Sequence, residues 1–196
     1  IVNTNGLDLW LEKLKQVTFH NKLGNQFERV ERITNLSGTI AKKIGCDPNL
    51  AKSAASISKS DLSSEMVYEF PELQGVMGTY YAIEVGFEEN IANACKEHYA
   101  PLGPSDEVPK SLTSIVVALA DKIDTLTSFW AINEKPTGSK DPFALRRSAL
   151  GLIRIIIEND IRISLSDILA LGNDGADIED LKYFIHQRMK VFLRDQ

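Results

Sequence analysis

Two aspartates with the potential for chemistry, Asp121 and Asp124, lie three residues apart in a strongly apolar segment. A spacing of three places both side chains on one surface of a helix. A buried carboxylate without a partner is costly, so each of them needs one. Two interpretations remain open. In the first, the pair binds a metal ion or a phosphate. In the second, it forms ion pairs or capping hydrogen bonds. The residue pattern favours the second, structural interpretation.

The histidines and cysteines of the chain do not form a recognisable site. His20, His98 and His186 are scattered, and a metal site needs three or four converging ligands. Cys46 and Cys95 have no neighbour at metal-ligand spacing, which predicts two free thiols. The sequence also lacks the common Gly-rich phosphate loops and the G-x-S-x-G nucleophile motif. No familiar catalytic motif is therefore present.

The charge of the chain is unevenly distributed. The whole sequence carries a formal net charge of -5, which argues against a surface devoted to coating nucleic acid. The stretch from Asp61 to Glu97 holds eight acids and one base, so it carries -7 and the remainder carries +2. A phosphate backbone would avoid the acidic stretch and could approach the remainder.

Apolar residues recur at helical spacing along the first half, and no segment is typical of a strand. We expect helices over 7–19 and 27–44, with a stop at Gly45. Asp47 and Pro48 supply a cap and a first-turn proline for a third helix that runs toward Phe70.

A further helix is expected from Glu72 to Val85, and it contains two glycines, Gly75 and Gly78. Glycine inside a helix costs up to about 1 kcal/mol relative to alanine. Either another backbone approaches closely at these positions, or the glycines are simply tolerated.

The second half continues the helical pattern after a proline-rich loop at 101–109. A helix is expected over 111–130, and a second loop over 133–140. Asp141 and Pro142 predict the start of a helix that is apolar nearly all round, which would occupy the centre of the fold. Its narrow polar stripe would consist of Arg147, Arg154 and Glu158. Closing helices over 164–171 and 177–194 complete an all-α fold, a compact multi-helix bundle.

Composition agrees with an ordinary globular protein, since 43% of the residues are hydrophobic and 25% are charged. No apolar run approaches the roughly 20 residues that span a bilayer, and the first residues lack the features of a secretory signal. These features predict a cytoplasmic protein without a membrane partner. The chain begins with Ile1 and not with Met, which suggests part of a longer polypeptide.

Two strings make the chain resemble the beta subunit of the bacterial two-subunit glycyl-tRNA synthetase. They are Glu69-Phe-Pro-Glu-Leu-Gln-Gly-Val-Met-Gly-Thr-Tyr-Tyr-Ala82 and Lys135-Pro-Thr-Gly-Ser-Lys-Asp-Pro-Phe-Ala-Leu-Arg-Arg147. Shorter matches occur in the family's order and extend the resemblance from about Phe19 to Glu158. These are Phe19-His-Asn-Lys-Leu-Gly24, Arg29-Val-Glu-Arg-Ile33, Lys59-Ser-Asp-Leu62, Glu97-His-Tyr99 and Ala118-Leu-Ala-Asp-Lys-Ile-Asp-Thr-Leu126.

The resemblance implies a tetramer of two alpha and two beta subunits that charges tRNA(Gly). In that family the alpha subunit activates glycine with ATP and Mg, and the beta subunit chiefly helps to bind tRNA. The matched part, middle to C-terminal in the beta subunit, is similar to the HD phosphohydrolase superfamily. It implies that residues 1–196 form a single all-helical HD-like domain, with a lead-in over about 1–24 and closing helices over about 160–196.

The HD resemblance also implies a degenerate metal site. Active members hold metal with a His, a His-Asp pair and a distant Asp. By alignment Asp61 and Asp121 stand at the two acid positions, while Ser60 and Gln26 stand at the histidine positions. Neither Ser nor Gln supplies an imidazole nitrogen, so the resemblance predicts no metal and no catalytic residue in this segment.

The function expected from the resemblance is noncatalytic support of tRNA binding and subunit assembly. The candidates for phosphate contact are basic residues at a loop and helix start, where backbone N–H groups are expected to face outward. They are Lys135, Lys140, Arg146 and Arg147. Two alternatives remain. One is a residual metal-dependent phosphohydrolase that uses Asp61, Asp121 and His98, and the other is a pure scaffold.

Overall fold

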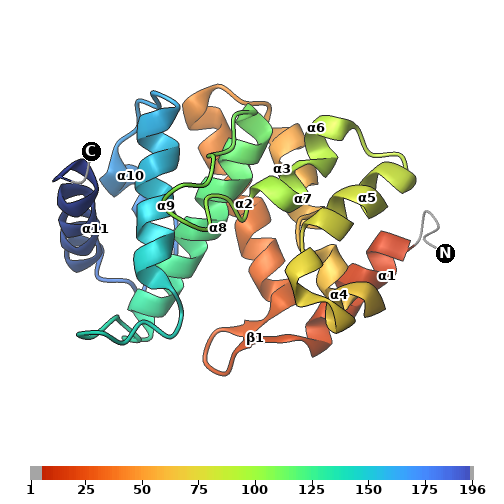
Figure 1. Ribbon diagram of the computed structural model, residues 1–196, viewed down its shortest axis with the longest axis horizontal. Helices are drawn as coiled ribbons and strands as arrows, with labels where there is room; N and C mark the ends of the chain where they lie inside the picture. The colour runs from red at the N-terminus through yellow and green to blue at the C-terminus, as the bar shows by residue number, and fades with distance from the viewer. Residues whose placement is uncertain (1–5, 195–196) are drawn as a thin grey trace.

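The computed structural model describes residues 6–194 and consists mostly of helices (Figure 1). This confirms the predicted all-α bundle, and the likeness to the HD superfamily stays a prediction. In chain order the elements are α1 (Gly6–Lys13), η1 (Leu14–Gln16), β1 (Thr18–His20), β2 (Gly24–Asn25), α2 (Gln26–Ile44), α3 (Pro48–Ile57), η2 (Ser60–Ser63), α4 (Glu65–Glu69), η3 (Pro71–Leu73), α5 (Val76–Glu84), α6 (Glu89–Ala92), α7 (Ala94–Glu97), α8 (Leu112–Ala131), α9 (Leu145–Glu158), α10 (Leu165–Leu169) and α11 (Ile178–Arg194).

The central helix of the bundle is α8, which packs against α2 on one side and α9 on the other (Figure 1). Every residue from 113 to 130 is buried, polar ones included. The prediction that α9 occupies the centre was wrong, because Ile157 on that helix remains 41% exposed. Arg154 is also not part of a polar stripe. It is buried and donates hydrogen bonds to the carbonyls of Gly103 and Asp106.

The predicted first helix is shorter than expected, and a small hairpin follows it. Helix α1 ends at Lys13, and β1 pairs antiparallel with β2, so the expectation of helix up to residue 19 was wrong. Gly24, the first residue of β2, has a φ of +85°, a left-handed conformation that favours glycine. The hairpin lets Phe19 reach the Phe129 ring of α8 edge-on, at 5.8 Å between centroids.

The predicted third helix is broken into α3, η2 and α4. Serine side chains explain the break, because they bond to the backbone locally and compete with helical hydrogen bonds. Ser58 donates to the carbonyl of Ala55, Ser60 donates to that of Ile57, and Ser64 caps α4. Helix α3 does begin as predicted, with the Asp47 side chain accepting a hydrogen bond from a backbone N–H.

The two glycines lie where another part of the backbone passes. Gly75 stands outside α5 as its N-cap with a φ of +80°, so the prediction of two internal glycines holds only for Gly78. A Cβ on Gly75 would lie 2.6 Å from the carbonyl oxygen of Cys95. The predicted close approach of a second backbone is therefore present, and it comes from α7.

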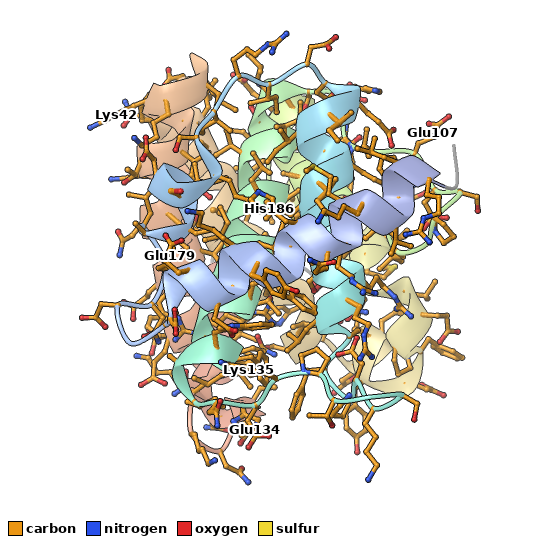
Figure 2. The ribbon with its side chains drawn as sticks, turned by 90° about the vertical axis from the view of Figure 1, so that its left-hand side faces the viewer. Lys42, Glu107, Glu134, Lys135, Glu179 and His186 are labelled. Carbon is orange, nitrogen blue, oxygen red and sulfur yellow. The ribbon has the colours of Figure 1, made fainter. Side chains whose placement is uncertain are left out.

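Different helices form the two ends of the long axis of the molecule. Helices α1, α4 and α5 lie at one end of the long axis, and α9 and α11 lie at the other (Figure 1). Figure 2 shows α11 crossing obliquely over the helices behind it. Helix α11 packs against α9 and α8, as expected for a closing helix.

Within residues 6–194 no helix has both the length and the apolar character that crossing a bilayer requires.

Candidate functional site

Two arginines of α2 face the two aspartates of α8. Arg29 and Arg32 are three residues apart on α2, and Asp121 and Asp124 are three residues apart on α8. Arg29 reaches both aspartates, and Arg32 reaches Asp124. The Arg29 Nη2 atom lies 3.0 Å from Asp121 Oδ1, and the Arg32 Nε atom lies 2.6 Å from Asp124 Oδ1. The ion pairs favoured for the two acids are therefore present.

A lysine joins this group from the segment after α3. The Lys59 Nζ atom lies 2.9 Å from Asp121 Oδ1 and 2.9 Å from His98 Nε2, and its side chain is only 2% exposed. Because an ammonium group can only donate, Nε2 must accept, and the proton on Nδ1 is donated to the carbonyl of Ala94. Burial and the Lys59 charge lower the pKa of His98 well below its usual range, so this ring is neutral.

Burial and neighbouring charges act in opposite directions on the ionised groups. Burial by itself would raise the pKa of Asp121, but Lys59 and Arg29 outweigh it and hold that pKa far below its usual range. Burial lowers the pKa of Lys59, although Asp121 acts against this shift. Asp121 is therefore a fixed anion that is surrounded by cations.

Lys122 is a further buried cation on α8. Its Nζ atom donates to the carbonyl oxygens of His98 and Ala100, at 3.2 and 2.9 Å. Burial lowers the pKa of Lys122 to about 8, against the opposing effect of Asp121. The group is thus still charged at neutral pH.

The other three positions of the expected degenerate site have separate local roles. The Asp61 Oδ2 atom accepts hydrogen bonds from the backbone N–H groups of Gly75 and Gly78, at 2.6 and 2.9 Å. Burial raises the pKa of Asp61 despite these donors. The Ser60 hydroxyl bonds to its own segment, and the Gln26 side-chain oxygen is buried without a hydrogen-bond partner among residues 6–194. The degenerate HD site itself stays a prediction.

This arrangement is unsuited to a divalent cation and suited to an anion. In the described part of the chain, no three His, Cys, Asp or Glu side chains gather as metal ligands. Asp121 is already neutralised by Lys59 and Arg29, which would repel a metal ion. Asp61 instead accepts hydrogen bonds where α5 begins. The side chains present can hold a negatively charged group.

The four basic residues proposed for phosphate contact occupy the 133–140 loop and the start of α9. Lys135 bonds to Asp180 of α11 at 2.8 Å, and Figure 2 shows it beside that helix. Its hydrogen bond and that of Trp130 lower the pKa of Asp180. Arg146 donates to the carbonyl of Gly138 at 2.7 Å. Lys140 and Arg147 are exposed.

The backbone at the start of α9 is not open to an anion. The Asp141 side chain accepts hydrogen bonds from the N–H groups of Leu145 and Arg146, at 2.8 and 2.9 Å. The expectation of outward-facing N–H groups was therefore wrong. Asp141 was also expected to cap a helix directly, but α9 starts later, after Ala144 with a φ of +54°.

A cavity of about 560 Å³ separates α9, α11 and the loop at 101–104. Arg146 and Arg147 of α9 line it on one side, and Arg188 of α11 lines it on the other. Its remaining walls are mainly apolar, with Leu150 and Phe192 among them. Sequence reasoning missed Arg188, because nothing in the spacing of α11 indicates that it crosses α9 at this point.

The comparisons with known proteins cover almost the whole chain. The profile of the family described as glycyl-tRNA synthetase beta subunit matches residues 3–196. The chain belongs to this family. It is 61% identical over 191 residues to the glycine–tRNA ligase beta subunit of Ruegeria sp. (strain TM1040), and 56% identical over 191 residues to that of Paracoccus denitrificans (strain Pd 1222).

The chain aligns with only part of each relative. The alignments cover 97% of this chain but 28% of each of these two beta subunits. The beta subunit of Cereibacter sphaeroides (strain ATCC 17029 / ATH 2.4.9) is 54% identical over 206 residues, with 100% of this chain and 30% of the relative covered. The chain thus spans less than a third of the length of the curated relatives it matches.

Sequence reasoning identified the acidic residues around Asp121 and missed the cationic residues that contact them. Arg29, Lys59 and Lys122 were not among the candidates. A signal was available for the first of them, since Arg29 and Arg32 repeat the three-residue spacing of the two aspartates. No such signal exists for Lys59, whose position depends on the break between α3 and α4.

Proposed function

We propose that this segment supports the charging of tRNA with glycine by helping the enzyme to bind tRNA and to assemble, without carrying out chemistry itself. The family assignment supports the first part of the proposal. The relatives are named glycine–tRNA ligase beta subunits, so the reaction expected of the whole enzyme is the ATP-dependent ligation of glycine to tRNA.

The observation that carries the tRNA proposal is the group of arginines around the cavity between α9 and α11, which we call the larger cavity. Arg146, Arg147 and Arg188 come from two helices and meet at one opening, with Lys140 exposed on the adjoining loop. Guanidinium groups bind phosphate oxygens through two parallel hydrogen bonds, which favours contact with a nucleic acid backbone. Lys135 has a smaller part in this proposal because Asp180 already holds it.

The opposite end of the molecule suits a protein partner better than RNA. Helices α4 and α5 and the segment between them carry exposed apolar side chains among acids. The exposed residues are Met66, Tyr68, Phe70, Tyr80 and Ile83. We assign this surface, which we call the α4–α5 surface, to the alpha subunit, and expect a basic patch on that partner. Exposed apolar groups of this kind commonly mark protein interfaces.

In this proposal the alpha subunit binds glycine, ATP and Mg. The whole enzyme is a tetramer of two alpha and two beta subunits, and it acts in the cytoplasm. The residues around Asp121 support this division of labour. They offer no group that could act as a nucleophile beside a base, because His98 is neutral, buried and bonded at both nitrogens.

Reversing the charges of Lys140 and Arg146 to Glu in the intact enzyme tests the tRNA assignment. We expect the affinity for tRNA(Gly) to fall about ten-fold or more, and the slope of log affinity against log salt to become shallower by about one per lost phosphate contact. Filter binding over a range of salt concentrations measures both quantities.

The matched control reverses Lys42 and Lys43, two exposed lysines at the end of α2. Figure 2 shows Lys42 near the top of the view and Lys135 near the bottom. This variant changes the net charge equally and should bind tRNA with a normal salt slope. Unchanged affinity and slope in the Lys140 and Arg146 variant, or equal losses in both variants, would remove the basis of the assignment.

Replacing Tyr68 and Tyr80 with Ser tests the proposed interface. These rings are 89% and 65% exposed, so the change should leave the fold intact and weaken association with the alpha subunit about ten-fold. Sedimentation velocity over a dilution series measures the association. Tyr183 on α11, which is also 65% exposed, provides the control substitution to Ser. Normal assembly of the Tyr68 and Tyr80 variant would contradict the assignment.

A further inference from the structure

A second, smaller cavity of about 280 Å³ opens beside Asp121. Four of its lining residues are cationic, namely Arg29, Lys59, Lys122 and Arg147, and Asp121 is the single carboxylate among them. They come from α2, from the segment after α3, from α8 and from α9. Aromatic rings line the rest of the cavity, and Phe129 and Phe143 are stacked there with centroids 4.3 Å apart.

We propose that this cavity binds a phosphate group directly through its lysines and arginines, with no metal ion. The ligand class is a small phosphomonoester or inorganic phosphate. This proposal goes beyond tRNA binding and does not depend on it, because the cavity is distinct from the larger one and is lined mostly by other residues.

The first argument is the imbalance of charge. Four cationic side chains line the cavity, and they are opposed by Asp121 and by Asp124, whose Oδ2 atom lies 3.5 Å from Arg29 Nε, so positive charges still outnumber negative ones. Like charges that are buried close together repel strongly in a medium of low dielectric constant. Burial is the main cause that lowers the pKa of Lys122, and repulsion from Lys59 and Arg29 lowers this pKa further. A bound anion would relieve it.

The second argument is the number of hydrogen-bond donors still available. The Lys59 ammonium has three protons, and two are directed at Asp121 and His98. Two of the three protons of Lys122 are directed at backbone carbonyls. Arg147 forms no side-chain hydrogen bond with any residue from 6 to 194, so its whole guanidinium group remains free. Each of these three side chains can therefore donate to a ligand.

The third argument is the match of this donor set to a phosphate. A phosphate presents several acceptor oxygens in a tetrahedral arrangement, and it can receive donors from several directions at once. Donors here come from different helices around one opening. A volume of about 280 Å³ lies at the small end of ligand sites, which favours a phosphate with a small substituent.

The test measures the binding of inorganic phosphate to the full-length beta subunit alone by titration calorimetry. The wild type should bind phosphate saturably. Arg147→Ala should bind about ten-fold more weakly, since a hydrogen bond to a charged group contributes roughly 1.5–3 kcal/mol. Arg162→Ala is the matched control, because Arg162 is an exposed arginine that lines neither cavity, and its loss should leave phosphate affinity unchanged.

A second variant, Lys122→Met, removes a donor from inside the cavity, and its melting curve shows whether it folds. If it folds, its phosphate binding should also be lost. Absence of saturable binding to the wild type, or equal affinities for the wild type and Arg147→Ala, would overturn the proposal. Arg147 is exposed, so Arg147→Ala should fold normally. It therefore tests the proposal even if Lys122→Met does not fold.

Further titrations identify the source of the phosphate. Tighter binding of adenosine monophosphate than of inorganic phosphate, with no binding of adenosine, would support the site and indicate a nucleotide. Displacement of phosphate by tRNA with a 5′ phosphate, and not by tRNA lacking it, would support the site and indicate the end of the tRNA. Binding of adenosine as tight as that of its monophosphate would contradict a phosphate site.

Discussion

Replacing Asp121 with Asn is expected to lower the free energy of unfolding by about 3–5 kcal/mol, because it leaves the buried Lys59 without its counterion and Arg29 with Asp124 alone. Lys59 is 2% exposed and Arg29 is 12% exposed, and both contact the same carboxylate oxygen. The amide keeps the size of the side chain and removes only its charge. The loss therefore reports on the charge and not on a cavity.

Urea or thermal denaturation measures this effect. In a protein of this size each 1 kcal/mol corresponds to roughly 2–4 °C, so the melting temperature should fall by about 6–20 °C. Glu84→Gln, on the exposed side of α5, provides the control and should melt close to the wild type. Lys59→Met should cost less than Asp121→Asn, because Asp121 keeps Arg29 as a partner. The opposite order would show that Asp121 is not the centre of the ion pairs.

Replacing Gly75 with Ala is expected to destabilise the protein by about 2–4 kcal/mol, because two costs add at this position. The φ of +80° disfavours any side chain, and the new Cβ would lie 2.6 Å from the Cys95 carbonyl oxygen and 3.0 Å from the Tyr99 ring. A backbone carbonyl cannot move as easily as a flexible side chain. Helix α7 would have to shift away from α5.

Gly86→Ala separates the two costs. Gly86 has a φ of +94°, and no atom lies within 4 Å of the place that a methyl group would take, so this variant carries only the backbone cost of about 1–2 kcal/mol. The difference between the two variants in a denaturation experiment measures the clash with α7. Equal losses would mean that the close approach at Gly75 contributes nothing.

Regular helices of the fold could be predicted from the sequence, and short irregular segments could not. The apolar spacing from Ile115 to Leu126 places α8 within one residue of its observed bounds. The same reasoning missed the hairpin at 18–25, because Phe19 fits a helical apolar stripe as well as it fits a strand that reaches the core. It also ran α3 on to Phe70, where serine hydroxyls end the helix early.

The candidate site was only partly predictable for a related reason. Asp121 and Asp124 could be identified because carboxylates in an apolar helix demand partners. Their partners are 60 to 95 residues away in the sequence, and only the packing of α2, α3 and α8 determines which bases reach them. Apolar periodicity also cannot rank helices by burial. For that reason the sequence predicted α9 as the central helix, although the central helix is α8.

The paired arginines and aspartates between α2 and α8 also select how the two helices are aligned along their length. Apolar stripes repeat with every turn, so sliding one helix by about 5.4 Å could bury a similar area. Such a slide would separate Arg29 from Asp121 and Arg32 from Asp124, and these pairs lie within ion-pair distance in the observed alignment. Four charged side chains thereby exclude misaligned packings that hydrophobic contacts alone would tolerate.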